Sequence, residues 1–152
     1  MKSNLPSAES GGLVRLASSQ EIGPLAMQVF QVLRRVADAV QRHDAGALLA
    51  EFALDDPRFT VFETTTPYRM SAVDLKGTAS VLAALRDPDM RFEDVRLDCA
   101  ETVALVTGYQ VLRAGSEETR RRYSSRFTMV MVPLVDGWKI LHAHFSSVPG
   151  TQ

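Results

Sequence analysis

Hydrophobic residues recur at helical spacing in the first third of the chain. Within residues 25–40 they fall three and four positions apart, and most of the positions between them are polar. Pro24 suits the first turn of a helix, which we predict to end near His43. A second, shorter helix is predicted over residues 44–52, because an aspartate at its start is a good N-cap.

Beyond residue 58 the pattern is mainly that of β-strands, with one interruption. β-branched and aromatic residues predict a strand over residues 59–65 and a short one over 68–72. Thr78 can cap a third helix that ends near Leu85. Four further strands are predicted over residues 92–99, 102–113, 120–135 and 138–147. The Asp-Gly pair between the last two strands is a strong hairpin signal.

This order of elements predicts an α+β fold. Three helices cannot cover both faces of such a sheet, so we expect them to pack on one face. The expected shape is a cone-shaped α+β barrel, with three N-terminal helices on a strongly bent, mostly antiparallel sheet. Residues 1–20 are rich in Ser, Gly and Pro without periodicity, which predicts a flexible tail before a domain over residues 21–150.

Alternation along the last two strands makes both of their faces largely apolar. On the last strand, Trp138, His142 and His144 share one face by parity. On the strand before it, Phe127 and Met129 alternate with Arg126, Thr128 and Val130. One face must meet the helices, and the other is too apolar for solvent, so we predict that it meets a second subunit. We place Trp138, His142, His144, Phe127 and Met129 in the interface of a homodimer.

Composition and charge narrow the classes of partner. The 152 residues are 45% hydrophobic and 23% charged, as expected for one ordinary domain. A net charge of -1 lacks the basic excess of proteins that bind nucleic acid or membrane surfaces. With no bilayer-spanning stretch and no apolar segment of signal-peptide type, a cytoplasmic location is expected.

The candidate metal ligands are few. The single cysteine, Cys99, excludes an intramolecular disulfide and disfavours a cysteine-based zinc site. His142 and His144 stand two apart on one strand face, but the sequence shows no third ligand at a matching position. We predict that they form a hydrogen-bonded pair in the interface and that the protein has no metal site.

The segment over residues 136–149, DGWKILHAHFSSVP, resembles the end of SnoaL-like domains of the nuclear transport factor 2-like superfamily. Those domains typically finish with Asp-Gly-x-Trp-x-Ile-x-His-x-His followed by Ser. The segment is also similar to the end of the association (hub) domain of calcium/calmodulin-dependent kinase II. The resemblance covers roughly residues 25–149 and implies the cone fold. That fold hosts isomerases, cyclases, dehydratases, epoxide hydrolases and non-catalytic oligomerisation modules.

The resemblance allows a test against ketosteroid isomerase. In that enzyme a carboxylate shuttles a proton, while a tyrosine and a protonated aspartate stabilise the enolate oxygen. The carboxylate corresponds to Glu63, the tyrosine to Val36 and the aspartate to Val130. Because valine cannot donate a hydrogen bond, the oxyanion stabilisation is lost, which argues against steroid isomerase activity.

The kinase hub gives a second comparison. Its pocket carries several arginines, and the matching positions here are near Gln110, Val130 and Phe145. Arg126 is then the cation that could reach the pocket, where it could bind a carboxylate. An ion pair between Arg126 and Glu63 is the structural alternative, and it would leave little for catalysis.

Three functions stay open at this point. The first is a homodimer that binds a small, partly apolar molecule in the cone cavity. The cavity is predicted to be lined by Val36, Glu63, Tyr68, Gln110, Arg126, Val130 and Phe145. The second is an isomerase, cyclase or dehydratase without metal or organic cofactor, in which Glu63 is the general base and Arg126 stabilises the anion. The third is a hub-like oligomerisation module.

Overall fold

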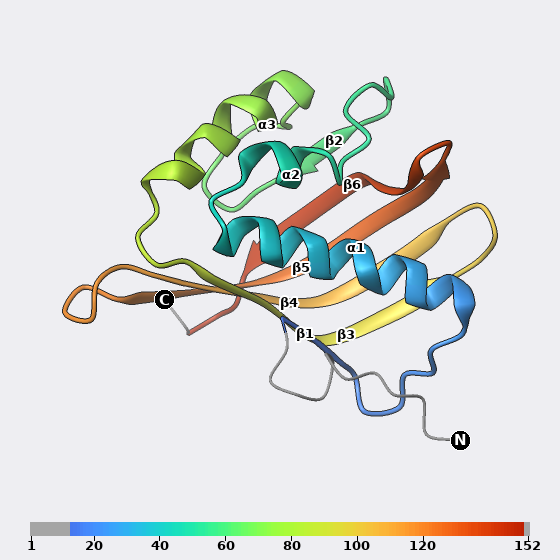
Figure 1. The fold of residues 1–152 in the computed structure, drawn as a ribbon, viewed down its shortest axis with the longest axis horizontal. Coiled ribbons are helices and arrows are strands. Elements are labelled where there is room, and N and C mark those ends of the chain that lie inside the picture. Colours follow the sequence, from blue (N-terminus) through green and yellow to red (C-terminus); the bar gives the residue numbers. More distant parts are fainter. Residues whose placement is uncertain (1–12, 151–152) are drawn as a thin grey trace.

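One six-stranded sheet organises the chain (Figure 1). In the computed structural model, which describes residues 13–150, the strands lie in the order β1-β3-β4-β5-β6-β2. Their bounds are Val14–Leu16 (β1), Thr60–Phe62 (β2), Asp89–Cys99 (β3), Ala104–Ala114 (β4), Arg121–Leu134 (β5) and Gly137–Ser147 (β6). Strands β3 to β6 form an antiparallel meander, and the short strands β1 and β2 add to its edges in parallel. The α+β class is confirmed, but the sheet is open and not a closed barrel.

The helices lie on one side of this sheet, and α1 crosses the face of the meander (Figure 1). Their bounds are Pro24–Gln41 (α1), Ala45–Leu49 (α2) and Ala72–Ala79 (α3), followed by a 3-10 turn, η1, at Ser80–Ala84. Pro24 begins α1 as predicted, and Asp44 caps α2 by accepting from the backbone N–H of Ala47 at 2.9 Å. No helix among the described residues is long and apolar enough to cross a membrane.

The core lies between α1 and the middle of the sheet. The buried side of α1 carries the apolar residues that its periodicity predicts: Val29, Phe30, Val32, Leu33, Val36, Ala37 and Val40. They meet Phe92 of β3 and Phe127 of β5, whose rings are 5.3 Å apart and nearly fully buried. These two aromatic rings therefore fill space on the helix side of the sheet, where the sequence predicts a hollow cone.

Three local predictions about elements are wrong. Residues 14–16, expected in a flexible tail, form β1, and Val14 is fully buried in the core; residues 1–12 of the predicted tail lie outside the described part. A three-residue strand is too short to show periodicity. The third helix begins at Ala72, six residues before Thr78, because Ser71 caps it. The short strand expected before it is reduced to a single bridge between Val61 and Met70.

A β-bulge decides which way the last strand presents its side chains. The pairing of β6 with β5 shifts register at one point, where Leu141 is an extra residue in β6. Before the bulge, Trp138 points toward α1 and is 5% exposed. After it, His142 and His144 point to the opposite face. The prediction that these three residues share a face is wrong, because simple alternation cannot count an inserted residue.

Candidate functional site

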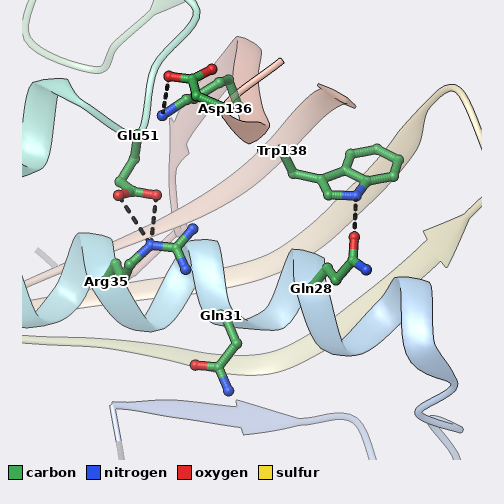
Figure 2. A pocket seen from close by; sticks show the side chains of 8 residues that line it. Gln28, Gln31, Arg35, Glu51, Asp136 and Trp138 are labelled. Atoms are coloured by element: carbon green, nitrogen blue, oxygen red, sulfur yellow. Dashed lines mark hydrogen bonds and ion pairs between the residues drawn. The ribbon is translucent and has the colours of Figure 1, made fainter. Parts of the chain in front are cut away.

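A cavity opens where α1 meets the hairpin between β5 and β6 (Figure 2). Its volume is about 460 Å³. The lining residues are Gln28, Gln31, Arg35, Glu51, Asp136, Gly137, Trp138 and Lys139. The three from α1 stand at spacings of three and four, so they lie on one side of the helix. The others come from the end of the α2 region and from the hairpin.

An ion pair at one end of the cavity fixes the arginine. Glu51 is held in place because its carbonyl accepts from the backbone N–H of Ile140 on β6 at 2.9 Å. Its side chain is only 9% exposed, and both carboxylate oxygens accept from Nε of Arg35, at 2.9 and 3.1 Å. The two terminal nitrogens of Arg35 point away from Glu51, toward the side of the cavity where Gln28 and Trp138 lie (Figure 2).

The other end of the cavity is fixed by neutral and charged hydrogen bonds. The indole N–H of Trp138 donates to the side-chain oxygen of Gln28 at 2.9 Å. Lys139 is largely buried, and its Nζ donates to the carbonyl of Ala50 at 2.5 Å and lies 3.4 Å from Asp136. The cavity thus contains two cations and two anions. Lys139 and Glu51 are already partnered, which leaves the terminal nitrogens of Arg35 as the positive group directed at solvent.

This cavity is not predicted from the sequence. Its only signal there is the set of polar positions between the hydrophobic ones of α1, which by itself indicates no site. Nothing in the sequence indicates that Glu51, sixteen residues after Arg35, folds back onto the helix. That contact depends on the backbone bridge between residues 51–53 and Ile140, which brings distant parts of the chain together.

The two predicted catalytic residues have separate local partners in the structure. Glu63 follows β2, and its carboxylate accepts from the hydroxyl of Thr64 at 3.0 Å and from the backbone N–H of Thr65 at 3.0 Å. Arg126 lies on β5 opposite Ser146 and donates from Nε to that hydroxyl at 3.2 Å. The carboxylate therefore stabilises a local turn. The predicted alternative, an ion pair between Glu63 and Arg126, is replaced by these two separate sets of contacts.

The predicted cavity residues are divided between two faces of the sheet. Val36 is buried in the core, and Gln110 and Phe145 lie on the helix side, opposite Phe92 and Phe127 respectively. Val130 points to the opposite face, as Arg126 does, since β5 alternates and its neighbours Phe127 and Met129 are buried. Tyr68 is 54% exposed in the loop between β2 and α3.

The predicted interface residues are divided in the same way. Phe127, Met129 and Trp138 are 3%, 1% and 5% exposed, because α1 and the rest of the core cover them within the single chain. Their assignment to an outward face is wrong. His142 and His144 do lie on the outward face, where Phe62 of β2 packs beside both rings. His142 also contacts the hydroxyl of Thr60 at 2.9 Å.

The face of the sheet opposite α1, which we call the open face, carries exposed apolar side chains. Leu105 and Tyr109 of β4 are 43% and 40% exposed. Leu105 is paired with the half-buried Val130 of β5, and Tyr109 is paired with Arg126. Over these central strands, no helix of the described residues lies on this side (Figure 1).

Groups with shifted pKa values lie outside the cavity. Hydrogen bonds from Arg58 lower the pKa of Asp56 to about 2. Burial raises the pKa of the Cys99 thiol, and the neighbouring carboxylate of Asp98 adds to the effect. Residues 13–150 contain no group of three or more His, Cys, Asp and Glu side chains placed to hold a metal ion.

The fold and sequence now define the family. The chain belongs to the SnoaL-like domain family, whose model matches residues 29–150. A search of curated proteins finds no match to the sequence. The structure is similar to a proposed calcium/calmodulin dependent protein kinase II association domain from Xanthomonas campestris, with a TM-score of 0.72 and 13% identity over 88% of this chain and 95% of that one.

Two further solved structures show the range of this fold. A proposed dehydratase of the NTF2-like family from Streptomyces avermitilis has a TM-score of 0.71 and 20% identity, over 82% of this chain and 96% of that chain. The CaMKII hub from S. rosetta has a TM-score of 0.66 and 20% identity, over 84% and 99%. Likeness at this level of identity concerns the fold alone, since one fold hosts many functions.

Proposed function

We propose that this SnoaL-like domain acts as a homodimer, in which two copies associate through the open face of the sheet. The observation that carries the proposal is the exposed apolar centre of that face, formed by Leu105, Tyr109 and Val130. Thr107 and Thr128 lie between Leu105 and Tyr109 on this face. Exposed apolar side chains in the middle of a sheet cost free energy in water, and covering them with a second copy recovers that cost.

The charges around this apolar centre favour a two-fold arrangement. On the side of β3, the open face carries Asp98 and Glu93, paired with Leu105 and Tyr109 respectively. On the side of β5 and β6 it carries Arg126 and His144. A two-fold axis that runs parallel to the strands, along the middle of the open face, would set the β3 side of one copy against the β5–β6 side of the other. Asp98 and Glu93 would then lie opposite Arg126 of the partner subunit, while Arg91 and Arg96 add two cations to the β3 side.

The comparisons support assembly as a use of this fold. A calcium/calmodulin-dependent kinase II hub is among the solved structures that the chain resembles over most of its length. The enzyme hypothesis lacks equivalent support, since Glu63 and Arg126 have separate local partners. Ligand binding in a cone cavity also lacks equivalent support, because Phe92 and Phe127 fill space on the helix side of the sheet.

The proposed interface can be tested by placing a charged side chain in the apolar centre of the open face. Leu105→Glu should convert the dimer to a monomer, because a desolvated carboxylate beside Asp98 opposes association. The matched control is Val73→Glu, at a position that is 77% exposed on α3, on the other side of the molecule. Sedimentation velocity would measure the subunit number of both variants at the same concentration. A Leu105→Glu protein that stays folded and dimeric would refute this interface.

A further inference from the structure

We propose that the cavity beside α1 binds a small carboxylic acid as its anion, and that Arg35 is the residue that holds it. This site is separate from the open face, so the inference goes beyond the proposed dimer. The carboxylate would receive two parallel hydrogen bonds from the terminal nitrogens of Arg35, the geometry in which a guanidinium binds a carboxylate most strongly.

The arginine is oriented before any ligand arrives. Glu51 accepts from Nε alone, with both of its oxygens, so the nearly buried carboxylate orients the guanidinium of the half-exposed Arg35. Among residues 13–150, no contact to the two terminal nitrogens is found. An arginine held by one edge, with its opposite edge facing a cavity of about 460 Å³, loses little conformational entropy when an anion binds.

The other charges select a monoanion. Glu51 and Asp136 both line the cavity, and Lys139 is already bound to Asp136 and to the carbonyl of Ala50. A doubly charged phosphate would meet two carboxylates and only one available cation. A single carboxylate carries one negative charge, which the available cation, Arg35, balances. A cation is disfavoured because it would lie directly before the guanidinium of Arg35.

The remaining walls accept a polar body beyond the carboxylate. The side-chain oxygen of Gln28 is taken by Trp138, which leaves its amide nitrogen as a donor beside the cavity. Asp136, whose side chain is 71% exposed at the far side, offers acceptor oxygens. A hydroxy acid has both an anion for Arg35 and a hydroxyl for one of these groups, and lactate is the simplest probe of this class.

Trp138 provides a direct readout. It is the only tryptophan in the sequence, so the ¹H–¹⁵N spectrum of the protein contains one indole signal, and that N–H lies in the cavity wall. Titration with sodium lactate should shift this signal saturably at millimolar concentrations. Lactamide, which replaces the carboxylate by a neutral amide, and sodium chloride at equal ionic strength should not.

Variants connect the shift to Arg35. Arg35→Lys keeps a cation for Glu51 but removes the pair of terminal guanidinium nitrogens that would bind the carboxylate. It should weaken lactate binding by about tenfold. The matched control Arg42→Lys changes the arginine at the C-cap of the same helix, outside the cavity, where the side chain is 55% exposed against 54% for Arg35. This variant should leave binding unchanged. Gln28→Glu keeps an acceptor for Trp138 and adds a negative charge, and should also weaken binding.

Three results would overturn the proposal. They are the absence of a saturable shift with lactate, an equal shift with lactamide, and an equal loss of binding in Arg35→Lys and Arg42→Lys. If Arg35→Lys fails to fold, Gln28→Glu decides the question, since it leaves the ion pair with Glu51 untouched. The subunit number of each variant is measured beside the titration, so that a failure of this site is distinguished from a failure of the dimer.

Discussion

At the scale of single residues, Gly108 shows how closely the strands approach one another. A Cβ atom at this position in β4 would lie 3.0 Å from the carbonyl oxygen of Glu93 and 3.2 Å from the ring of Phe127. The crowding arises because the pairing of β3 with β4 shifts register next to Asp94, which has a φ of 51°. The close contacts therefore favour a residue without a side chain opposite the bulge.

This crowding predicts the effect of adding one methyl group. Gly108→Ala should lower the free energy of unfolding by about 1–3 kcal/mol, because backbone atoms cannot move aside as a flexible side chain can. Gly77→Ala, inside α3, is the control. Nothing lies within 4 Å of its added Cβ, so stability should rise by up to about 1 kcal/mol. Urea unfolding measures both, and equal effects would contradict the account.

At the scale of elements, α3 depends on its first turn. Ser71 and Asp74 form a capping box, in which the backbone N–H of Ser71 donates to Asp74 at 2.9 Å and the Ser71 hydroxyl accepts from the backbone N–H of Asp74 at 3.4 Å. The helix has eight residues, and of these only Ala79 is buried. Its stability therefore relies on the cap more than on packing.

Ser71→Ala should destabilise the protein by about 1 kcal/mol, since it removes an acceptor for the helix N-terminus. Thr78→Ala in the same helix is the comparison. It removes a hydroxyl that bonds back to the carbonyl of Asp74 and replaces a weak helix former by the strongest one, so it should be neutral or slightly stabilising. Thermal unfolding of both variants checks the prediction. A larger loss in Thr78→Ala would show that the cap is not the source of stability.

The elements also show what could be predicted from the sequence. The amphipathic pattern of α1, its Pro24 start and the four long strands were correctly expected, because each rests on a periodicity within one segment. The bulge at Leu141 was not expected, because an inserted residue leaves no local signal in the sequence. It places Trp138 on the face opposite to His142 and His144. On β5, alternation separated the two faces correctly. The sequence alone does not show which of these faces meets the helices, because that depends on tertiary contacts. The prediction that Phe127 and Met129 face outward was wrong, since both are buried.

The candidate site residues show the same limit on what the sequence can predict. His142 and His144 were correctly placed on an outward face, while Phe127 and Met129 belong to the core. Glu63 corresponds to the shuttle carboxylate of ketosteroid isomerase, yet a carboxylate at a strand end bonds as readily to its own turn. The contact of Arg35 with Glu51 joins residues whose proximity exists only in the folded chain.

At the scale of the whole molecule, the sheet has one covered face and one open face. Helix α1 and the core cover one side, and Leu105 and Tyr109 remain exposed on the other. The cavity at Arg35 lies where α1 meets the β5–β6 hairpin, so a partner on the open face would leave it accessible (Figure 1, Figure 2). Assembly and carboxylate binding can therefore coexist in one protein and be tested separately.

The measurement that tests the dimer most directly is the mass of the intact protein in solution by native mass spectrometry. A homodimer should have twice the chain mass of 16.7 kDa at micromolar concentration, and raising the ionic strength should weaken it only partly, because its centre is apolar. A protein that is monomeric throughout this concentration range would contradict the account, and the exposed side chains of the open face would then need a different explanation.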